Sequence, residues 1–306
     1  SWREIEEIWY PKHLSLEQCS SEITARYKAR LSQGDSLTDL TGGFGIDCSF
    51  LATGFKSATY VERQEELCEI AAHNFPILNL NHINVRNEDG VAYLQTMSPV
   101  DCIFLDPARR NEHGGKTVAI SDCEPNVAEL EDLLLSKASR IMIKLSPMLD
   151  LSLALKELKH TQEVHILSVN NECKELLILL GQTSPAEITI HCVNLFTKGT
   201  QEEQHFVFTR EQEQRSQCTY TDSLGDYLYE PNASLLKAGA FRSIAAAYPV
   251  RKLHPNSHLY TSDTFIENFP GRIFRIVNQC SFNKKEVKEN LADLKKANVT
   301  VRNFPA

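Results

Sequence analysis

The sequence predicts an α/β fold, in which a doubly wound, mostly parallel sheet follows a helical N-terminal segment and precedes a small α+β appendage. Short apolar runs alternate with helical patterns from Ser36 to Val169, which is typical of parallel strands joined by helices. Three further apolar runs follow too closely for helices to fit between them. Of the 306 residues, 42% are hydrophobic, an ordinary fraction for a chain that buries a core.

The elements of the large domain are expected in chain order. Residues 2–31 favour helix, with a break at Pro11. Strands are expected at 36–40, 57–62, 83–87, 101–106, 140–146 and 163–169, and helices at 45–54, 64–75, 90–97, 126–137 and 149–159. The runs "KELLILLG", "ITIHCVNLF" and "HFVFTR" then predict antiparallel strands that finish one edge of the sheet.

The last third of the chain predicts a smaller unit. The polar residues 211–222 are expected to be a linker, and "YLYEP" a strand. The pattern then predicts a helix at 233–248, loop and extended chain at 249–262, and a β-α-β unit at 271–277, 283–297 and 299–304. We expect the chain to be a fragment whose last unit continues past Ala306, because the helix that should follow the final strand is missing.

Charge is distributed unevenly along the chain. The net charge is −8, yet residues 231–306 hold twelve Lys and Arg against five Asp and Glu, so this segment carries +7 and residues 1–230 carry −15. Such asymmetry favours an acidic body with a basic segment that binds a polyanion such as RNA. The alternative is a small domain with solvated lysine faces. Cations alternate with aromatic rings over 237–254, a mixture used by single-stranded RNA binding.

Several classes of protein are disfavoured. No apolar run approaches the ~20 residues of a membrane span, and no signal peptide opens the chain. Nine cysteines without a C-x-x-C pair argue against a disulfide framework or a zinc ribbon, and favour a cytoplasmic protein. The ten histidines show no H-E-x-x-H spacing, so we expect no metal site.

The stretch "DLTGGFGID" (39–47) lies at a predicted strand-to-helix turn, where small residues let backbone N–H groups approach a cofactor. It is not a dinucleotide fingerprint, because Cys48 stands where the third glycine is needed. Asp39 would repel a pyrophosphate but suits a ligand with an ammonium group. Glu62 ends the second strand, where a carboxylate can accept both ribose hydroxyls. A nucleoside with a cationic amino-acid tail and no phosphate fits both acids, and S-adenosylmethionine is such a ligand.

Two more acids fall at the same predicted edge. Asp89 follows the third strand and could bind an adenine amino group, and Asp106 follows the fourth. Ligands of open α/β sheets bind beyond the carboxyl ends of the strands. One acid there is commonly a helix cap or a turn residue, but four in register with a glycine turn favour a binding site.

The motifs "DLTGGFGID", "YVE", "EDG" and "LDPAR" together resemble the class I, Rossmann-like methyltransferases over about residues 20–210. More narrowly, "QCSSEITARYKA", "LDPARR", "NNECKELLILL" and "YLYEPNASLLKAGAF" resemble the bacterial THUMP-like domain-containing methyltransferases. The resemblance implies a seven-stranded sheet, and segments at 1–34 (helical), 35–212 (methyltransferase), 219–262 (ferredoxin-like) and 270–306 (THUMP-like, RNA-binding).

The resemblance also implies the residues that bind S-adenosylmethionine. Asp39 and the glycine turn would hold the methionine portion, Glu62 the ribose and Asp89 the adenine. The remaining positions expected to bind the cofactor are Thr41, Gly42, Gly43, Gly45, Arg63 and Gly90.

Methyl transfer needs alignment of the acceptor and a route for its proton. Amino-methylating relatives carry Asp/Asn-Pro-Pro and an aromatic residue that stacks on a base, whereas this chain has "DPAR". Asp106, Pro107 and Arg109 are therefore the expected catalytic residues, with the guanidinium of Arg109 stacking or holding a phosphate.

The acceptor atom stays open. Carbon-5 pyrimidine methyltransferases need a Cys after the next strand, and "KLSPM" offers Ser146 instead, so a Cys adduct is not expected. Lys144 and Ser146 at this strand end, with Arg110, are candidates for substrate contact, although local capping is the alternative. We expect a methyltransferase that acts on RNA through residues 231–306. The alternatives are a small-molecule or protein methyltransferase, or an inactive protein that binds RNA or cofactor.

Overall fold

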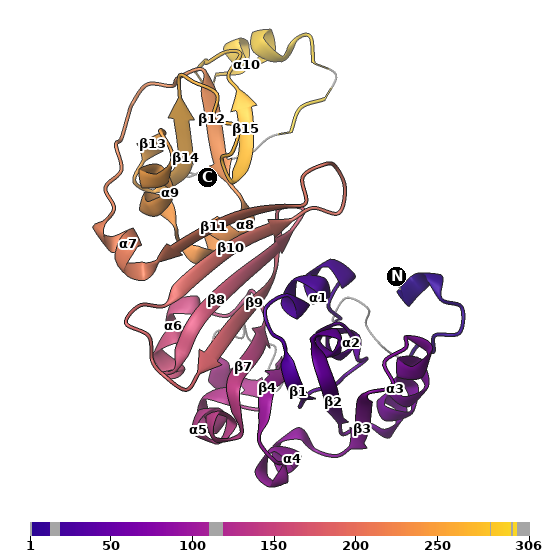
Figure 1. Cartoon of the computed structure of the whole chain (residues 1–306). Coiled ribbons are helices and arrows are strands. Elements are labelled where there is room, and N and C mark those ends of the chain that lie inside the picture. The colour runs from indigo at the N-terminus through magenta and orange to yellow at the C-terminus, as the bar shows by residue number, and fades with distance from the viewer. Residues whose placement is uncertain (1, 13–18, 110–118, 282, 295, 299–306) are drawn as a thin grey trace.

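The computed structural model describes residues 2–12, 19–109, 119–281, 283–294 and 296–298. A nine-stranded sheet runs through the molecule in the order β3-β2-β1-β4-β7-β9-β8-β10-β11 (Figure 1). Its strands are β1 (Gly34–Asp39), β2 (Phe55–Glu62), β3 (Ile83–Asn87), β4 (Val100–Leu105), β7 (Ala138–Leu145), β8 (Thr161–Val169), β9 (Glu172–Gly181), β10 (Thr189–Leu195) and β11 (Glu203–Thr209). Only β9 and β11 run antiparallel to their neighbours, so the sheet is mixed and mostly parallel.

The count of seven strands is wrong, because β10 pairs in parallel with β8 and β11 adds a second extra strand. β9 does not finish the edge either: it lies between β7 and β8, antiparallel to both. Its residues 175–181 are all buried, which suits a strand covered on both faces. Asn170 and Asn171 form the tight β8–β9 turn with positive φ, a conformation that Asn tolerates well.

Helices cover both faces of the sheet, as a doubly wound fold requires. α1 (Glu22–Ala29), α2 (Ile46–Leu51) and α3 (Glu65–Ile77) lie on one face. α4 (Gly90–Thr96), α5 (Val127–Lys137) and α6 (Leu151–Glu157) lie on the other, where their apolar side chains join the largest buried cluster. Short elements complete the domain: η3 (Ala52–Gly54), β5 (Ala108–Arg109), η4 (Ile120–Asp122) and β6 (Cys123–Glu124).

The N-terminal segment is less helical than predicted. It contains the 3₁₀ turn η1 (Trp2–Glu4) and α1, which begins after the N-cap Ser21, while residues 8–11 form neither helix nor strand. Tertiary contacts account for this, because the Asn74 side chain hydrogen-bonds both backbone groups of Trp9 at 2.9 Å. Trp2 meanwhile packs edge-on against Phe44 at 5.1 Å between ring centroids.

The C-terminal appendage is a four-stranded antiparallel sheet in the order β13-β14-β12-β15, with helices beside it. Its elements are β12 (Tyr227–Pro231), α8 (Ala233–Ala238), α9 (Phe241–Ala247), β13 (Arg251–His254), β14 (Ser257–Ser262), β15 (Gly271–Arg275) and α10 (Lys284–Leu291). The small α+β unit is thus present, with more strand than predicted.

Four boundaries in this region differ from the predictions. The helix expected at 233–248 is two helices, because Gly239 adopts φ 74° and ends α8. Residues 249–262 contain the β13–β14 hairpin. The expected linker begins with α7 (Arg210–Arg215), and Thr209 and Gln212 form a capping box at the N-terminus of this helix. α10 is shorter than the helix expected at 283–297, and the strand expected at 299–304 lies outside the described residues.

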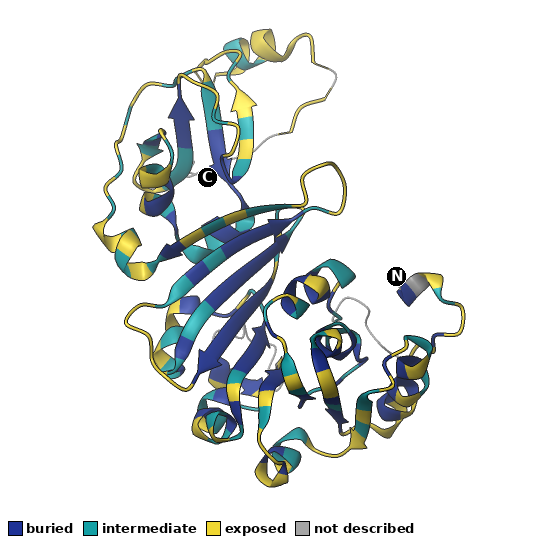
Figure 2. Cartoon of the chain, viewed as in Figure 1, coloured by how far each residue is buried: buried dark blue, intermediate teal, exposed yellow. Residues whose placement is uncertain are grey.

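The appendage shares a core with the large sheet. Leu235, Ile244, Tyr260 and Phe269 belong to the same buried cluster as the strands β7 to β10 (Figure 2). A bridge of amides adds to this contact, since Gln204 Oε1 accepts from Asn194 at 3.3 Å and Asn232 at 3.1 Å. The appendage is therefore packed firmly on the sheet. Within the described part of the chain, no helix combines the length and apolar character needed to cross a membrane.

Candidate active site

A cavity of about 1280 Å³ opens at the carboxyl ends of β1, β2, β4 and β7. Nearly all residues that the sequence nominated line it: Asp39, Thr41, Gly42, Gly43, Gly45, Glu62, Arg63, Asp89, Gly90, Asp106, Pro107, Lys144 and Ser146. Arg109 lies on β5, and Arg110 lies outside the described residues. The cavity also takes in residues just before α1 and residues of the β8–β9 hairpin: Cys19, Ser20, Ser21, Val169, Lys174 and Glu175.

Tyr60 holds the glycine turn from below. Its hydroxyl donates to the Gly43 carbonyl, and a Cβ on Gly42 would lie 2.3 Å from its ring, so only glycine fits at that position. Glu62 holds the turn from the side: one carboxylate oxygen accepts from Gly43 N and the other from Gln64 N, both at 2.9 Å. Two side chains of β2, Tyr60 and Glu62, thus fix the glycine turn before any ligand binds.

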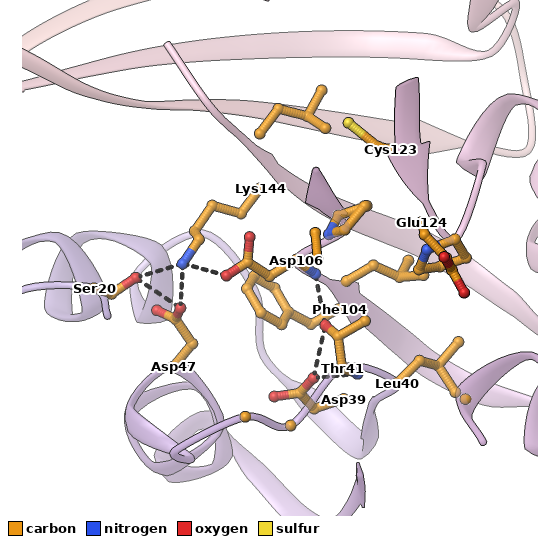
Figure 3. Close-up of a pocket in the computed structure, with 18 of the residues that line it drawn as sticks. Ser20, Asp39, Leu40, Thr41, Asp47, Phe104, Asp106, Cys123, Glu124 and Lys144 are labelled. Atoms are coloured by element: carbon orange, nitrogen blue, oxygen red, sulfur yellow. Dashed lines mark hydrogen bonds and ion pairs between the residues drawn. The ribbon is translucent and has the colours of Figure 1, made fainter. Parts of the chain in front are cut away.

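Thr41 connects the two acids at the centre of the cavity (Figure 3). Its backbone N–H donates to Asp39 Oδ1 at 3.0 Å, and its hydroxyl accepts from the backbone N–H of Asp106 at 2.6 Å. Burial raises the pKa of Asp39 to about 8, partly offset by the Thr41 hydrogen bond. In the unliganded protein Asp39 is therefore largely protonated near neutral pH.

The remaining residues expected to bind the cofactor, Asp89, Gly90 and Arg63, also line the cavity. Asp89 is the N-cap of α4, and its Oδ1 accepts from Val91 N and Ala92 N at 3.0 Å. Gly90 follows it and passes so close to β1's end that a Cβ would lie 2.1 Å from the Leu40 carbonyl oxygen. Arg63 faces Glu124 at 3.7 Å, and both side chains are exposed.

A buried ion network supports the acceptor end of the cavity. Lys144 Nζ lies 2.5 Å from Asp106 Oδ2, 3.2 Å from Asp47 Oδ2 and 3.0 Å from the Ser20 hydroxyl. Lys28, whose side chain is fully buried, extends this network.

Lys28 Nζ contacts Asp47 Oδ1 at 3.0 Å and Glu175 Oε2 at 2.5 Å, and donates to Ser20 at 2.9 Å. We call Ser20, Lys28, Asp47, Asp106, Lys144 and Glu175 the lysine–carboxylate network. It contains three acids and two lysines from α1, α2, β7, β9 and two loops.

The network sets the charge of its members. Burial alone would raise the pKa of Asp47, but the two ammonium groups lower it well below its ordinary value. Burial would lower the pKa of Lys144, but the carboxylates of Asp47 and Asp106 raise it well above its ordinary value. Withdrawal from water raises the pKa of Asp106, and Lys144 opposes that rise. Asp106 also has the most exposed side chain of the three network acids, at 36%, so it is the acid that a substrate can reach.

The other acceptor-side residues come from the segments after β4 and β7. Cys123, Glu124, Pro125 and Asn126 line the cavity beside Pro107. The Ser146 hydroxyl accepts from Met148 N at 3.3 Å, which is the local capping role considered for it, although it also lines the cavity.

Sequence reasoning missed Lys28, Asp47 and Glu175. Asp47 stands inside the motif "DLTGGFGID" and could have been noticed as an acid in the first turn of a helix. Lys28 and Glu175 are separated by 147 residues and meet only because β9 inserts beside β7. No local sequence pattern predicts such a pair.

Comparisons with known proteins agree with this architecture. Residues 227–270 match a family of ferredoxin-like domains, and residues 271–306 match a family of THUMP-like domains. The small sheet spans both matches, since β15 pairs with β12. No curated protein matches the chain.

Among solved structures, a candidate methyltransferase from Porphyromonas gingivalis W83 is 39% identical with a TM-score of 0.89, covering 100% of this chain and 76% of that protein. Two structures are much less similar. One is a candidate methyltransferase from Streptococcus mutans in complex with S-adenosylhomocysteine (SAH; 13% identity, TM-score 0.37, 52% of this chain and 96% of that one). The other is TrmK of M. capricolum in complex with SAH (13%, 0.41, 55% and 70%), and neither bears on the function of this chain at such scores.

Identity of 39% over the whole chain establishes kinship with the P. gingivalis protein, and the strand order β3-β2-β1-β4-β7-β9-β8 is that of the class I methyltransferase sheet. The chain therefore belongs to the family of the P. gingivalis protein, which joins a class I S-adenosylmethionine-dependent methyltransferase fold to ferredoxin-like and THUMP-like C-terminal domains.

Proposed function

We propose that the protein is an S-adenosylmethionine-dependent methyltransferase that acts on RNA. The observation that carries the proposal is the large cavity described above, in which a preformed glycine turn and buried Asp39 face the lysine–carboxylate network. The four segments 1–34, 35–212, 219–262 and 270–306 and a cytoplasmic location remain part of this proposal.

The cavity fits S-adenosylmethionine in its chemistry. Asp39 is buried with a pKa near 8, so a cation nearby would favour its ionised form. Glu62 is placed to accept ribose hydroxyls with the lone pairs that Gly43 N and Gln64 N do not use. In this proposal Thr41, Gly42, Gly43 and Gly45 hold the methionine portion and Asp89, Gly90 and Arg63 the adenosine.

S-adenosylmethionine supplies an activated methyl group when bound. Transfer breaks the sulfur–carbon bond, forms a bond from carbon to the acceptor, and leaves the acceptor with one proton to lose. Asp106 is the group placed to orient the acceptor and to take that proton, because it is partly exposed and its pKa is raised. Lys144 fixes one carboxylate oxygen of Asp106, and Pro107 fixes the chain that follows it.

The position of the appendage supports RNA as the substrate class. Ala233 N, at the start of α8, donates to Asn171 Oδ1 in the β8–β9 turn, and Lys237 Nζ donates to the Leu149 carbonyl. Leu149, Val169 and Lys174 line the cavity. The appendage that carries the ferredoxin-like and THUMP-like matches is thus joined through α8 of the ferredoxin-like part to loops that line the cavity.

The mixture of cations and rings at 237–254 contributes less to RNA binding than its sequence suggested. Lys252 is buried, and its ammonium donates to the carbonyls of His254, Pro255 and Ser257. Phe241 stacks on His258 at 3.5 Å between ring centroids. Arg242 is exposed within this stretch, but more exposed basic residues lie farther along the chain, on β15 and α10: Arg272, Arg275, Lys284, Lys285 and Lys288. We therefore assign RNA contact chiefly to 271–298.

The test is transfer of tritium from methyl-labelled S-adenosylmethionine into total RNA from cells that lack the protein. Wild type should label RNA, and Asp106→Asn should lower the rate at least about 100-fold, the usual loss when an electrostatic contact to the reacting centre is removed. The control Asp35→Asn, at the opposite end of β1, should label RNA normally. Label that enters protein or small molecules and not RNA would contradict the choice of substrate.

A further inference from the structure

A row of histidines lies outside the cavity, on the sheet face that α1 covers. His165 on β8 and His191 on β10 are partners in the parallel register, and their rings stack at 4.2 Å with an angle of 6° between planes. His191 Nδ1 in turn lies 3.1 Å from Nε2 of His205 on β11. Three adjacent strands thus each contribute one imidazole to the same face.

Glu163 adds a carboxylate to this row. It precedes His165 by two residues on the same face of β8, and its Oε2 lies 3.1 Å from His165 Nε2. One ligand atom from each of Glu163, His165 and His191 lies within 4.8 Å of the other two. Tetrahedral zinc with bonds of about 2.1 Å places its ligand atoms about 3.4 Å apart, so the side chains would rotate to bring all three onto one ion.

The surroundings hold the candidate ligands in place. His191 is partly buried, and its ring lies flat against that of His165. Arg140 lies 3.7 Å from the other oxygen of Glu163, Oε1, and leaves Oε2 directed at His165.

Tyr27 completes the surroundings from α1. Its hydroxyl lies 2.8 Å from His165 Nδ1, the nitrogen that would not bind the ion. Metal-binding histidines ordinarily have such a partner on the second nitrogen, which fixes the ring and its tautomer. Farther along the same face of β8 and β10, the side chains that pack under α1 are apolar: Leu167, Val193 and Leu195. The contact with α1 therefore does not by itself explain why histidines stand in this row.

We propose that Glu163 Oε2, His165 and His191 bind one divalent first-row transition ion, with His205 as the hydrogen-bonding neighbour of His191. Imidazoles with one carboxylate suit zinc and its neighbours rather than magnesium or calcium. The ion would tie β8 and β10 to each other and, through Tyr27, to α1. Lys28 follows Tyr27 on α1 and belongs to the lysine–carboxylate network, so the ion would also stabilise the part of α1 that supports the cavity. The proposal is independent of the methyltransferase reaction.

The test is titration of chelator-treated, full-length protein with zinc chloride by calorimetry, and with cobalt chloride by visible absorption. We expect one site with micromolar affinity or tighter, a melting temperature raised by zinc, and cobalt bands typical of nitrogen and oxygen ligands. Glu163→Gln and His191→Ala should each weaken binding at least tenfold. The control His73→Ala, which alters a histidine stacked on Trp9 outside the row, should bind as wild type.

His205→Ala is a second test that should not disturb folding, because His205 is exposed. It should weaken binding less than His191→Ala, since a water molecule can replace it. Circular dichroism of each metal-free variant shows whether it is folded. Zinc affinity unchanged in Glu163→Gln and His191→Ala, the absence of binding, or cobalt bands from thiolate ligands of the free cysteines would overturn the proposal.

Discussion

The two ends of the cavity are built in different ways. The cofactor end is made of backbone: a glycine turn whose N–H groups are fixed by Glu62 and whose shape is fixed by Tyr60. The acceptor end is made of charged side chains, held by the lysine–carboxylate network. In the proposed function, the first arrangement would recognise a ligand that is the same in every reaction, whereas the second holds the Asp106 carboxylate at a defined position.

Because the acceptor end is held by buried charges, we expect the loss of one charged group of the network to lower the stability of the fold more than the loss of an exposed charge elsewhere. Lys28→Met should reduce the free energy of unfolding by about 3–5 kcal/mol, because it leaves Asp47 and Glu175 buried without one of their cations. Urea unfolding followed by circular dichroism measures this. Lys56→Met, which removes an exposed partner of Asp35, should leave the unfolding midpoint almost unchanged. Equal effects of the two changes would mean that the network does not stabilise the fold.

Asp39 gives the cofactor end a pH dependence near neutral pH. Its pKa is about 8 in the folded, unliganded protein and about 4 when unfolded, so the folded state binds the proton more tightly and its stability falls as pH rises from 4 to 8. A cationic ligand must displace that proton, so affinity for S-adenosylmethionine should increase as pH rises from 6 towards 8.

Asp39→Asn should bind the cofactor at least about tenfold more weakly, since a charge-assisted contact worth about 1.5–3 kcal/mol is lost, and its affinity should not change over this pH range. Calorimetry in buffers with different ionisation enthalpies reports the released proton directly. An Asp39→Asn variant with the same pH dependence as wild type would show that another group titrates.

The smallest effect is expected outside the cavity, on α10. Replacing the exposed Lys284, Lys285 and Lys288 with Ala should lower the slope of log affinity for RNA against log salt by about three, one for each phosphate contact. The matched control replaces exposed Lys56, Lys156 and Lys159 of the large domain. Filter binding over a range of salt concentrations measures both slopes, and an equal change in both would remove α10 from the RNA surface.

The same contrast explains what could be predicted from sequence. The cofactor end depends on contiguous residues at strand ends, so the motif "DLTGGFGID" and the acids Glu62, Asp89 and Asp106 all pointed to one edge, and all line the cavity. The network and the histidine row depend on which strands are neighbours. His165 and His191 are 26 residues apart in sequence and adjacent only because β10 pairs in parallel with β8, whereas the sequence predicted an antiparallel strand there.

Calorimetric titration of the full-length protein with S-adenosylmethionine at pH 8 tests the central claim most directly, with Glu62→Ala as the comparison. The account predicts one binding site with micromolar affinity in wild type, and binding at least about tenfold weaker in the variant because both ribose contacts and the support of Gly43 are lost. No binding to folded wild-type protein at millimolar cofactor would contradict the assignment of the cavity.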